Sequence, residues 1–304
     1  MAQASETGER LFISWGELLW DLFPDGPRLG GAAANLAYHL ARLGRLAQLV
    51  SRVGNDELGR RAVSELSRAG IRVDLIQVDA LAPTGTVTVE LTEGEPSYRI
   101  ATAVAWDRIE LDAELTRALQ NARAVAFGTL AQRTALMRTH LERALRVLPS
   151  DCLRLCDLNV RAPFVDRELI EATVSHADVV KLNEQELGLL GTFCPGANVV
   201  DWLFAQPRVR LVAVTLGAAG CQLHTKGESV SAPGVRRDTS NGDRVGAGDA
   251  FAAVLLSDLV EGLPLTDIAR RANSYASAVA ALRGGMPAGV DPSHLDPDSS
   301  LGGC

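Results

Sequence analysis

The sequence has few cysteines, few aromatic residues and no long apolar run. Its five cysteines among 304 residues form an odd, sparse set, which is typical of reduced thiols rather than of a disulfide framework. No apolar run reaches the length of about eighteen residues that a transmembrane helix needs, so we expect no membrane partner. Residues 1–10 are polar and acidic and lack the pattern of a signal peptide. These absences predict a cytoplasmic protein.

The chain also lacks an excess of positive charge. It carries 30 lysines and arginines against 37 aspartates and glutamates, which gives a formal net charge of -7. Because binding to a nucleic-acid backbone needs a positive surface, we expect no nucleic-acid partner. An anionic ligand must therefore be held by local hydrogen-bond donors and a few basic groups.

The chain does contain a regular alternation of apolar strands and helical segments. Its hydrophobic content of 47% is ample for a core, and its length favours one large domain, residues 1–304, with an appendage. Residues 47–53 are typical of a strand, residues 57–69 of a helix and residues 71–78 of the next strand. Short links between such elements predict parallel pairing with right-handed crossovers. We expect an α/β fold with a central, mostly parallel, doubly wound sheet and helices on both faces.

Two segments depart from this alternation. Residues 84–102 predict a β-hairpin without a helix, because residues 86–91 alternate in polarity and residues 93–96 are typical of a turn. We expect this hairpin to be a lid over a site or the contact of a homodimer, with an ordinary edge hairpin as the alternative. Residues 286–304 are rich in Pro, Gly, Asp and Ser, which predicts a loosely held tail.

The stretch 242–251 carries most of the predicted chemistry. A polar loop leads into it and an apolar, alanine-rich run leads out, which indicates a loop that opens directly into a buried helix. Gly246 and Gly248 remove side chains where the helix exposes its first N–H groups, and these donors favour an anion. Asp249 would repel a phosphate bound there, so it suits a base that takes a proton from an attacking hydroxyl. The alternative is an Asp N-cap after a flexible glycine loop.

Polar residues gather after the ends of several predicted strands. In an open parallel sheet the carboxyl ends of the strands meet at one edge, and ligands bind there. The residues concerned are Asp157, Asn159, Arg161, Asn183, Glu186 and Thr215. We therefore expect the ligand site at this edge of the sheet.

Two motifs resemble the signatures of the ribokinase-like (PfkB) carbohydrate kinases. Gly246-Ala247-Gly248-Asp249-Ala250-Phe251 looks like the family's GAGDxF signature. Gly30-Gly31-Ala32-Ala33-Ala34-Asn35 resembles its N-terminal GGxxxN signature. The two signatures stand in the right order and far apart, which makes them far more specific than either alone. Further segments, including residues 127–133 and 181–184, look like members labelled fructokinase, and the resemblance extends from about residue 12 to about residue 287.

The resemblance implies an ATP-dependent sugar kinase that uses Mg²⁺ and phosphorylates a hydroxyl of a small sugar, with fructose as the expected substrate. Asp249 would be the base, and Gly246, Ala247 and Gly248 would frame the anion site. The N–H groups of residues 247–249 would stabilise the charge on the transferring phosphoryl group.

The resemblance also implies the remaining site residues. Those expected to meet the sugar are Asp21, Gly30, Gly31, Asn35 and Arg161. Those expected to meet the nucleotide are Asn183, Glu186, Thr215, Gly217, Gly220 and Asn273, with Glu186 holding Mg²⁺ through water. From the residues alone, Asp21 could instead be a surface turn residue, Arg161 a solvated side chain, and Asn183 with Glu186 the cap of a helix.

Three rival functions stay open at this point. A nucleoside kinase would need an aromatic or apolar wall, which the sparse aromatics near Asp21 and Asn35 hardly supply. A kinase for a sugar acid would need a second basic group facing Asp21, for which Arg99 or Arg133 could serve. Arg244, at a position where the family usually has Thr, motivates a non-catalytic sugar-binding regulator. The link from Asp21 to Gly30 is short, so we expect the first lid segment of larger relatives to be missing.

Overall fold

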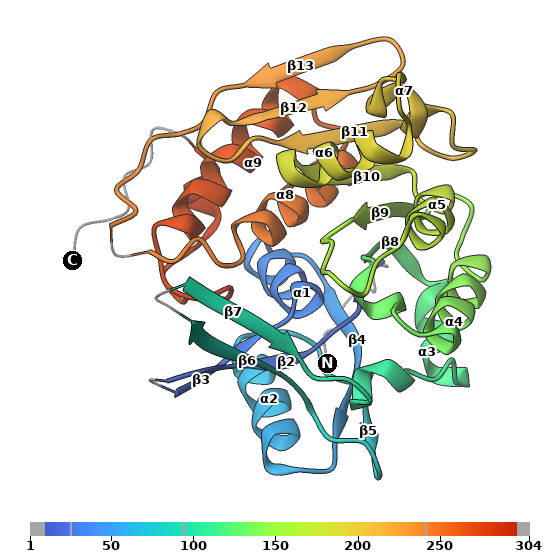
Figure 1. The fold of residues 1–304 in the computed structure, drawn as a ribbon, viewed down its shortest axis with the longest axis vertical. Helices are drawn as coiled ribbons and strands as arrows, with labels where there is room; N and C mark the ends of the chain where they lie inside the picture. Colours follow the sequence, from blue (N-terminus) through green and yellow to red (C-terminus); the bar gives the residue numbers. More distant parts are fainter. Residues whose placement is uncertain (1–9, 25, 93–94, 241, 297–304) are drawn as a thin grey trace, which may run out of the picture.

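The computed structural model describes residues 10–24, 26–92, 95–240 and 242–296. A nine-stranded sheet forms its centre, in the order β13-β12-β11-β10-β9-β8-β1-β4-β5 (Figure 1). These strands are β1 (Leu11–Trp15), β4 (Ala47–Gly54), β5 (Ile76–Asp79), β8 (Ala122–Phe127), β9 (Leu153–Asp157), β10 (Val179–Asn183), β11 (Leu211–Thr215), β12 (Cys221–His224) and β13 (Ser229–Ala232). All neighbours pair in parallel except β11 with β12 and β12 with β13.

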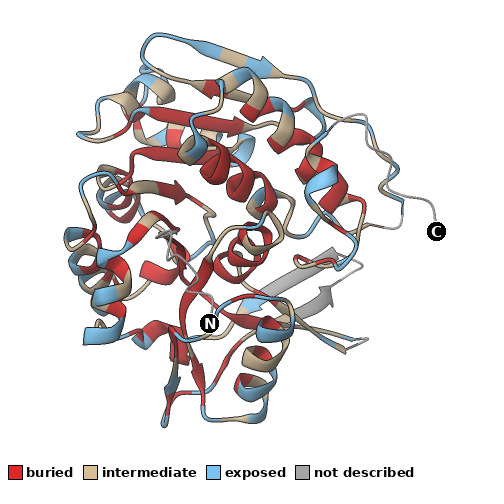
Figure 2. Ribbon diagram, turned by 180° about the vertical axis from the view of Figure 1, so that it is seen from behind, coloured by how far each residue is buried: buried red, intermediate tan, exposed pale blue. Residues whose placement is uncertain are grey.

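Helices cover both faces of this sheet, and each face has its own apolar core (Figure 1). One core involves α1 (Ala32–Arg42), α2 (Glu57–Arg68), α8 (Ala247–Glu261) and α9 (Leu265–Ala280). The other involves α3 (Ala113–Gln120), α4 (Ala135–Arg146), α5 (Arg167–Ser175), α6 (Glu184–Phe193) and α7 (Val199–Phe204). Buried residues follow the strands through the middle of the molecule (Figure 2). The predicted α/β fold with a central, mostly parallel sheet is confirmed.

The predicted hairpin is present but belongs to a larger element. The strands β6 (Gly85–Thr92) and β7 (Glu95–Ile100) pair with each other, and β6 also pairs in parallel with β2 (Leu19–Phe23). Antiparallel β3 (Gly26–Gly30) completes a four-stranded sheet in the order β3-β2-β6-β7, which we call the lid sheet. The expectation that the first lid segment is missing is therefore wrong. The link from Asp21 to Gly30, expected to be too short for a lid segment, instead contributes β2 and β3, which are half of the lid sheet. Its role as a dimer contact stays a prediction.

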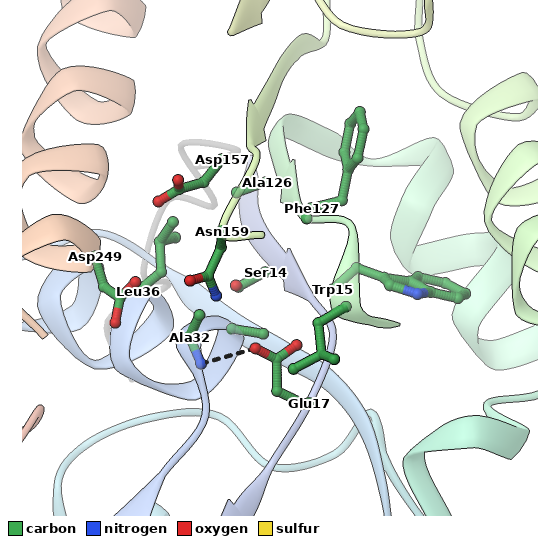
Figure 3. A pocket seen from close by; sticks show the side chains of 13 residues that line it. Ser14, Trp15, Glu17, Ala32, Leu36, Ala126, Phe127, Asp157, Asn159 and Asp249 are labelled. Carbon is green, nitrogen blue, oxygen red and sulfur yellow. Dashed lines mark hydrogen bonds between the residues drawn. The ribbon is translucent and has the colours of Figure 1, made fainter. Parts of the chain in front are cut away.

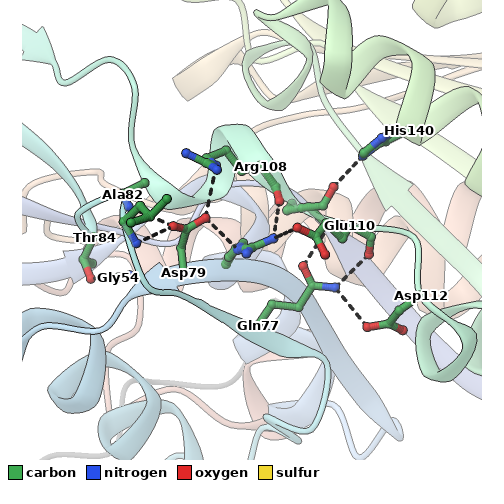
Figure 4. A network of polar contacts seen from close by, with 12 residues as sticks. Gly54, Gln77, Asp79, Ala82, Thr84, Arg108, Glu110, Asp112 and His140 are labelled. Carbon is green, nitrogen blue, oxygen red and sulfur yellow. Dashed lines mark hydrogen bonds and ion pairs between the residues drawn. The ribbon is translucent and has the colours of Figure 1, made fainter.

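A buried carboxylate fixes the segment by which the lid sheet leaves the central sheet (Figure 4). Asp79, at the end of β5, accepts hydrogen bonds of 2.8 Å from the backbone N–H groups of Leu81 and Ala82. The same carboxylate forms ion pairs with Arg52 at 3.0 Å and Arg108 at 3.2 Å. These contacts hold the chain segment that leads into β6 against β5, the edge strand of the central sheet.

Residues 286–296 of the expected tail pack against α1. The hydroxyl of Tyr38 donates to the carbonyl of Pro287 at 2.7 Å, and Arg42 donates to the carbonyl of Val290 at 2.9 Å. The side chains of Val290 and His294 are buried. This part of the tail is held more firmly than its composition predicts, and residues 297–304 lie outside the described residues.

Two further expectations concern thiols and membranes. The described cysteines, Cys152, Cys156, Cys194 and Cys221, are buried and free, in line with the predicted reduced thiols, and Cys304 lies outside the described residues. Among the described helices, none combines the length and the apolar character that crossing a membrane requires.

Candidate functional site

The helix α8 begins where the glycine-rich stretch predicts. Gly246 is the N-cap in the left-handed region, with φ of 77°, and a Cβ at this position would lie 2.6 Å from the backbone of Gly285. Glycine is therefore required both by the backbone conformation and by the close approach. The following apolar residues of α8 are buried against the sheet, so the first turn of the helix stays at the carboxyl edge of the strands.

Asp249, in this first turn, meets the N-terminal motif directly. The side-chain amide of Asn35, on α1, donates a hydrogen bond of 2.7 Å to Oδ2 of Asp249. Burial, and next the charge of Asp157, raise the pKa of Asp249 to about 7, while the hydrogen bond from Asn35 and the charge of Lys181 act in the opposite direction. A carboxylate that titrates near neutral pH is suited to act as a general base.

A cavity that is partly open to solvent lies beside Asp249 at the carboxyl ends of β1, β8 and β9 (Figure 3). Its lining consists of Ser14, Trp15, Glu17, Ala32, Ala33, Leu36, Ala126, Phe127, Gly128, Leu130, Asp157, Asn159 and Asp249. The polar part thus holds the carboxylates of Glu17, Asp157 and Asp249, with no basic side chain among the lining residues. The rings of Trp15 and Phe127 pack in the core on the opposite side of the sheet from α8. The polar lining of the cavity is therefore acidic, and among the described residues that line it no aromatic ring forms a wall.

Asp21 and Arg161 lie near each other but do not line this cavity. Asp21, on β2, lies against Gly30 of β3, where a Cβ would be 2.6 Å from its Oδ2. Burial raises the pKa of Asp21 to about 6, against the opposing charges of Arg161 and then of Arg28. The side chain of Arg161 is exposed, as the solvated alternative predicts. Their contact with a sugar stays a prediction.

The segment between the lid sheet and α1 is also held by a carboxylate. Glu17 is buried, and its Oε1 accepts a hydrogen bond of 3.0 Å from the backbone N–H of Ala32, the first residue of α1. Gly31 has a φ of 105°, and a Cβ there would lie 2.4 Å from the carbonyl oxygen of Glu17. Glycine is therefore needed at position 31 for the chain itself, before any ligand is considered.

Asn183 and Glu186 form the helix cap that the sequence left as an alternative. The side chain of Asn183 accepts from the N–H of Glu186 at 2.9 Å, and Glu186 Oε2 accepts from the N–H of Asn183 at 2.8 Å. Glu186 Oε1 accepts from the N–H of Val160, also at 2.8 Å, and the residue is 5% exposed. Both carboxylate oxygens are thus fixed by the backbone, and the role of Glu186 towards Mg²⁺ stays a prediction.

The remaining residues that were expected to meet the nucleotide are not among those that line the cavity beside Asp249. Thr215 ends β11, and Gly217 and Gly220 form the turn into β12. The side chain of Asn273, on α9, donates to the carbonyls of Ala232 and Pro233 at 3.0 and 3.3 Å. Its donors hold the segment after β13 against α9, and nucleotide contacts of these four residues stay predictions.

Two basic residues were named for the rival functions, Arg133 for a sugar acid and Arg244 for a regulator. The guanidinium of Arg133 is buried against Asp107, with two contacts of 2.7 Å, and stacks on Trp106 and Phe164. Its charge is neutralised there, so it is not the basic group that a sugar acid would need. Arg244 is exposed, with φ of 60°, in the loop before α8. Beside it, Asp243 forms an ion pair with Arg28 of the lid sheet at 3.7 Å.

Sequence reasoning missed Lys181 as a site residue. It is the middle residue of β10, where it pairs in register with Asp157 of β9, and its Nζ contacts both oxygens of Asp157 at 3.0 and 2.9 Å. The signal was a lysine inside an apolar strand, since a buried charge requires a partner.

Comparison with known proteins identifies the family and agrees with the fold. The model of the pfkB family carbohydrate kinases matches residues 27–290. A chloroplastic protein of Arabidopsis thaliana, named as a probable fructokinase, is 32% identical, with 91% of this chain and 79% of that protein covered. The structure of a fructokinase with bound ATP from Xylella fastidiosa superimposes with a TM-score of 0.81 at 24% identity, covering 94% and 97% of the two chains. An E. coli structure determined with ATP and Mg²⁺ has a TM-score of 0.81 at 19% identity, also covering 94% and 97%. At these sequence identities, the two structures support the fold alone.

Proposed function

The chain belongs to the pfkB family of carbohydrate kinases, and from this premise we propose that it transfers the γ-phosphoryl group of ATP to a hydroxyl of fructose. The observation that carries the proposal is the hydrogen bond between Asn35 and Asp249. It joins the two family-like motifs at one point, where a carboxylate with a pKa near 7 stands in the first turn of a helix. The relative named as a fructokinase supports the choice of sugar.

In this mechanism Asp249 accepts the proton of the sugar hydroxyl as its oxygen attacks the γ-phosphorus, and the bond from that phosphorus to the oxygen of the leaving ADP breaks. Asn35 orients the carboxylate through the hydrogen bond of 2.7 Å. The N–H groups of residues 247–249 at the start of α8 donate to the oxygens of the transferring group, where the helix dipole also favours negative charge. Positioning and electrostatics supply most of the rate in such a transfer.

The residues present are compatible with Mg²⁺ held through water. Each oxygen of Glu186 accepts one backbone N–H, and a carboxylate oxygen keeps a further lone pair for a water molecule. Mg²⁺ usually keeps several waters and shares few protein carboxylates with substrate phosphates, so it needs no cage of three acidic side chains. Among the described residues no such cage is present. When bound, the ion would neutralise phosphate charge.

The charges around the cavity favour a neutral sugar over a sugar acid. Glu17, Asp157 and Asp249 line it, and Lys181 offsets the charge of Asp157 alone, so a carboxylate on the substrate would meet a surplus of acidic groups. Carboxylates accept two hydroxyl bonds at once, which suits a polyol. The engaged guanidinium of Arg133 and the missing aromatic wall weaken the sugar-acid and nucleoside alternatives.

A panel of acceptors tests the proposal. ADP release from Mg²⁺-ATP is measured with fructose, ribose, 2-keto-3-deoxygluconate, adenosine and no acceptor. We expect fructose to give the highest kcat/KM and 2-keto-3-deoxygluconate to give little signal. Preference for another acceptor would keep the reaction and overturn the substrate. No acceptor-dependent release from a folded protein that binds ATP would favour a non-catalytic sugar-binding regulator.

A further inference from the structure

The ion pair between Lys181 and Asp157 lies directly against the first turn of α8. The side chain of Lys181 is 7% exposed, and a Cβ at Gly248 would lie 3.0 Å from its Nζ. The partner carboxylate of Asp157 lines the same cavity as Asp249 (Figure 3). Two buried, opposite charges thus flank the residue proposed as the base, one on each of two neighbouring strands.

The lysine carries its charge in this setting. Burial by itself lowers the pKa of Lys181, but the charges of Asp157, Glu186 and Asp249 outweigh that effect and raise the pKa above its ordinary value. A cation beside a helix N-terminus also works against the helix dipole, so the nearby carboxylates must stabilise it. A buried ion pair of this kind costs desolvation free energy, so we looked for a role besides packing.

The groups that act on Asp249 come from four elements. Asp157 from β9 and Glu17 from the β1–β2 connection favour its protonated form. Lys181 from β10 and the amide of Asn35 from α1 favour its ionised form. Lys181 is the cation of this set. Asp157 is its ion-pair partner but acts on the pKa of Asp249 in the opposite direction. Replacing either member of the pair therefore changes the charge balance at the base in a defined direction.

We propose that Lys181 and Asp157 are a positioning pair for phosphoryl transfer, whose opposed charges set the pH at which Asp249 becomes the free base. The inference rests on the proposed function, because it concerns the same base. The rival explanation is that Lys181 only neutralises Asp157 to keep the sheet folded. In that case replacement would lower stability and leave the ionisation of Asp249 unchanged.

The test compares the acid limb of kcat/KM for fructose in the wild type, Lys181→Gln, Asp157→Asn and the double variant. Glutamine removes the charge of Lys181 but still donates a hydrogen bond. We expect the limb of Lys181→Gln to move to higher pH and that of Asp157→Asn to lower pH, each by roughly one unit, with the double variant between them. Shifts in the same direction, or unmoved limbs with reduced stability, would overturn the proposal.

Arg208→Gln is the matched control. Arg208 pairs at 2.9 Å with the buried Asp178, which directly precedes β10 at its amino end, whereas the cavity lies at the carboxyl edge of the sheet. Arg208→Gln should lower the free energy of unfolding without moving the acid limb of kcat/KM. If Lys181→Gln does not fold, Asp157→Asn and the double variant still decide the matter, because the double variant must then titrate at higher pH than Asp157→Asn.

A second readout needs no activity and separates this inference from the proposed function. In each background, the free energy of unfolding is compared between Asp249 and Asp249→Asn over a range of pH. By linkage, this difference reports the folded-state titration of Asp249. We expect the same order of midpoints as in kinetics. An inactive wild type with this order retained would overturn the kinase proposal alone, and equal midpoints would overturn the role of the pair.

Discussion

The amide of Asn35 donates a hydrogen bond of 2.7 Å to Oδ2 of Asp249, across 214 positions of sequence. The bond fastens the start of α1 to the start of α8. It thereby holds α1, which follows the lid sheet in the chain, next to the N-terminal end of α8, where an anion is favoured. In the proposed reaction, the sugar hydroxyl that accepts the phosphoryl group and the ATP that donates it would meet where these two segments are held together.

The first prediction concerns the pH dependence of the reaction. Burial and the charge of Asp157 raise the pKa of Asp249 to about 7, so the carboxyl is protonated below this pH and cannot accept a proton. We expect kcat/KM for fructose to fall on the acid side with a midpoint near pH 7. Steady-state rates between about pH 5 and 9 measure it. A profile that stays level down to pH 5 would mean that Asp249 is not the base.

The second prediction concerns the replacement Asp249→Asn. We expect turnover to drop by ~10²–10⁴-fold, because the general base is removed. ADP release at pH 8, with fructose and ATP both saturating, measures this loss. A variant that turns over as fast as the wild type would exclude Asp249 as the base.

The third prediction is a gain of stability in the same variant, with a defined pH dependence. The folded pKa of Asp249 lies above its ordinary value of 3.8, so the folded state binds more protons between these two values. The stability of the wild type therefore falls as pH rises from about 4 to about 7. We expect Asp249→Asn to be more stable above pH 7, on the order of 1–4 kcal/mol, with a smaller difference near pH 4. Urea unfolding at both pH values tests this, and a difference that does not change with pH would contradict it.

The fourth prediction concerns the contact behind Asn35. A Cβ at Gly285 would lie 2.5 Å from the side-chain amide of Asn35. We expect Gly285→Ala to displace this amide, lower kcat/KM about tenfold and destabilise the fold by about 1–3 kcal/mol. Gly289→Ala is the control, since its Cβ would meet Leu282 at an ordinary 3.7 Å. Equal effects of the two variants would show that Asn35 does not depend on this packing.

The fifth prediction separates the structural role of Glu186 from its proposed role towards Mg²⁺. In Glu186→Gln, the amide NH₂ must face one of two backbone N–H groups, at Asn183 or Val160. In the presence of a chelator, we expect the free energy of unfolding of this variant to be about 1–3 kcal/mol lower than that of the wild type, because a buried backbone donor loses its acceptor. Thermal unfolding with EDTA measures it. Asn183→Asp, which keeps the cap acceptor, should lose less, and a fully stable Glu186→Gln would argue against the cap.

The starts of α1 and α8, where the predicted site residues lie, could be predicted because a glycine precedes each helix. Gly246 stands between a polar loop and an apolar run, so both the start of α8 and the place of Asp249 follow from local chemistry. The parallel sheet followed from alternating elements, which placed Asp157 and Asn159 at the carboxyl edge next to Asp249.

Other parts depend on pairing that no local pattern encodes. The strand β3 contains Gly26 and Pro27 and therefore looks like a turn, yet it is the edge of the lid sheet, where a proline is tolerated. Lys181 and Asp157 meet only because β9 and β10 are neighbours in one register. Arg133 was a plausible ligand residue until its contacts with Asp107 were known.

The most direct test of the account follows phosphorus from ATP to fructose by ³¹P NMR at pH 8, in the wild type and in Asp249→Asn. ATP binding is measured in parallel on both proteins. We predict that the wild type forms a phosphorylated fructose and ADP in equal amounts, while Asp249→Asn binds ATP normally and forms almost none. A phosphorylated sugar produced equally fast by Asp249→Asn would contradict the central claim that this carboxylate, held by Asn35, drives the transfer.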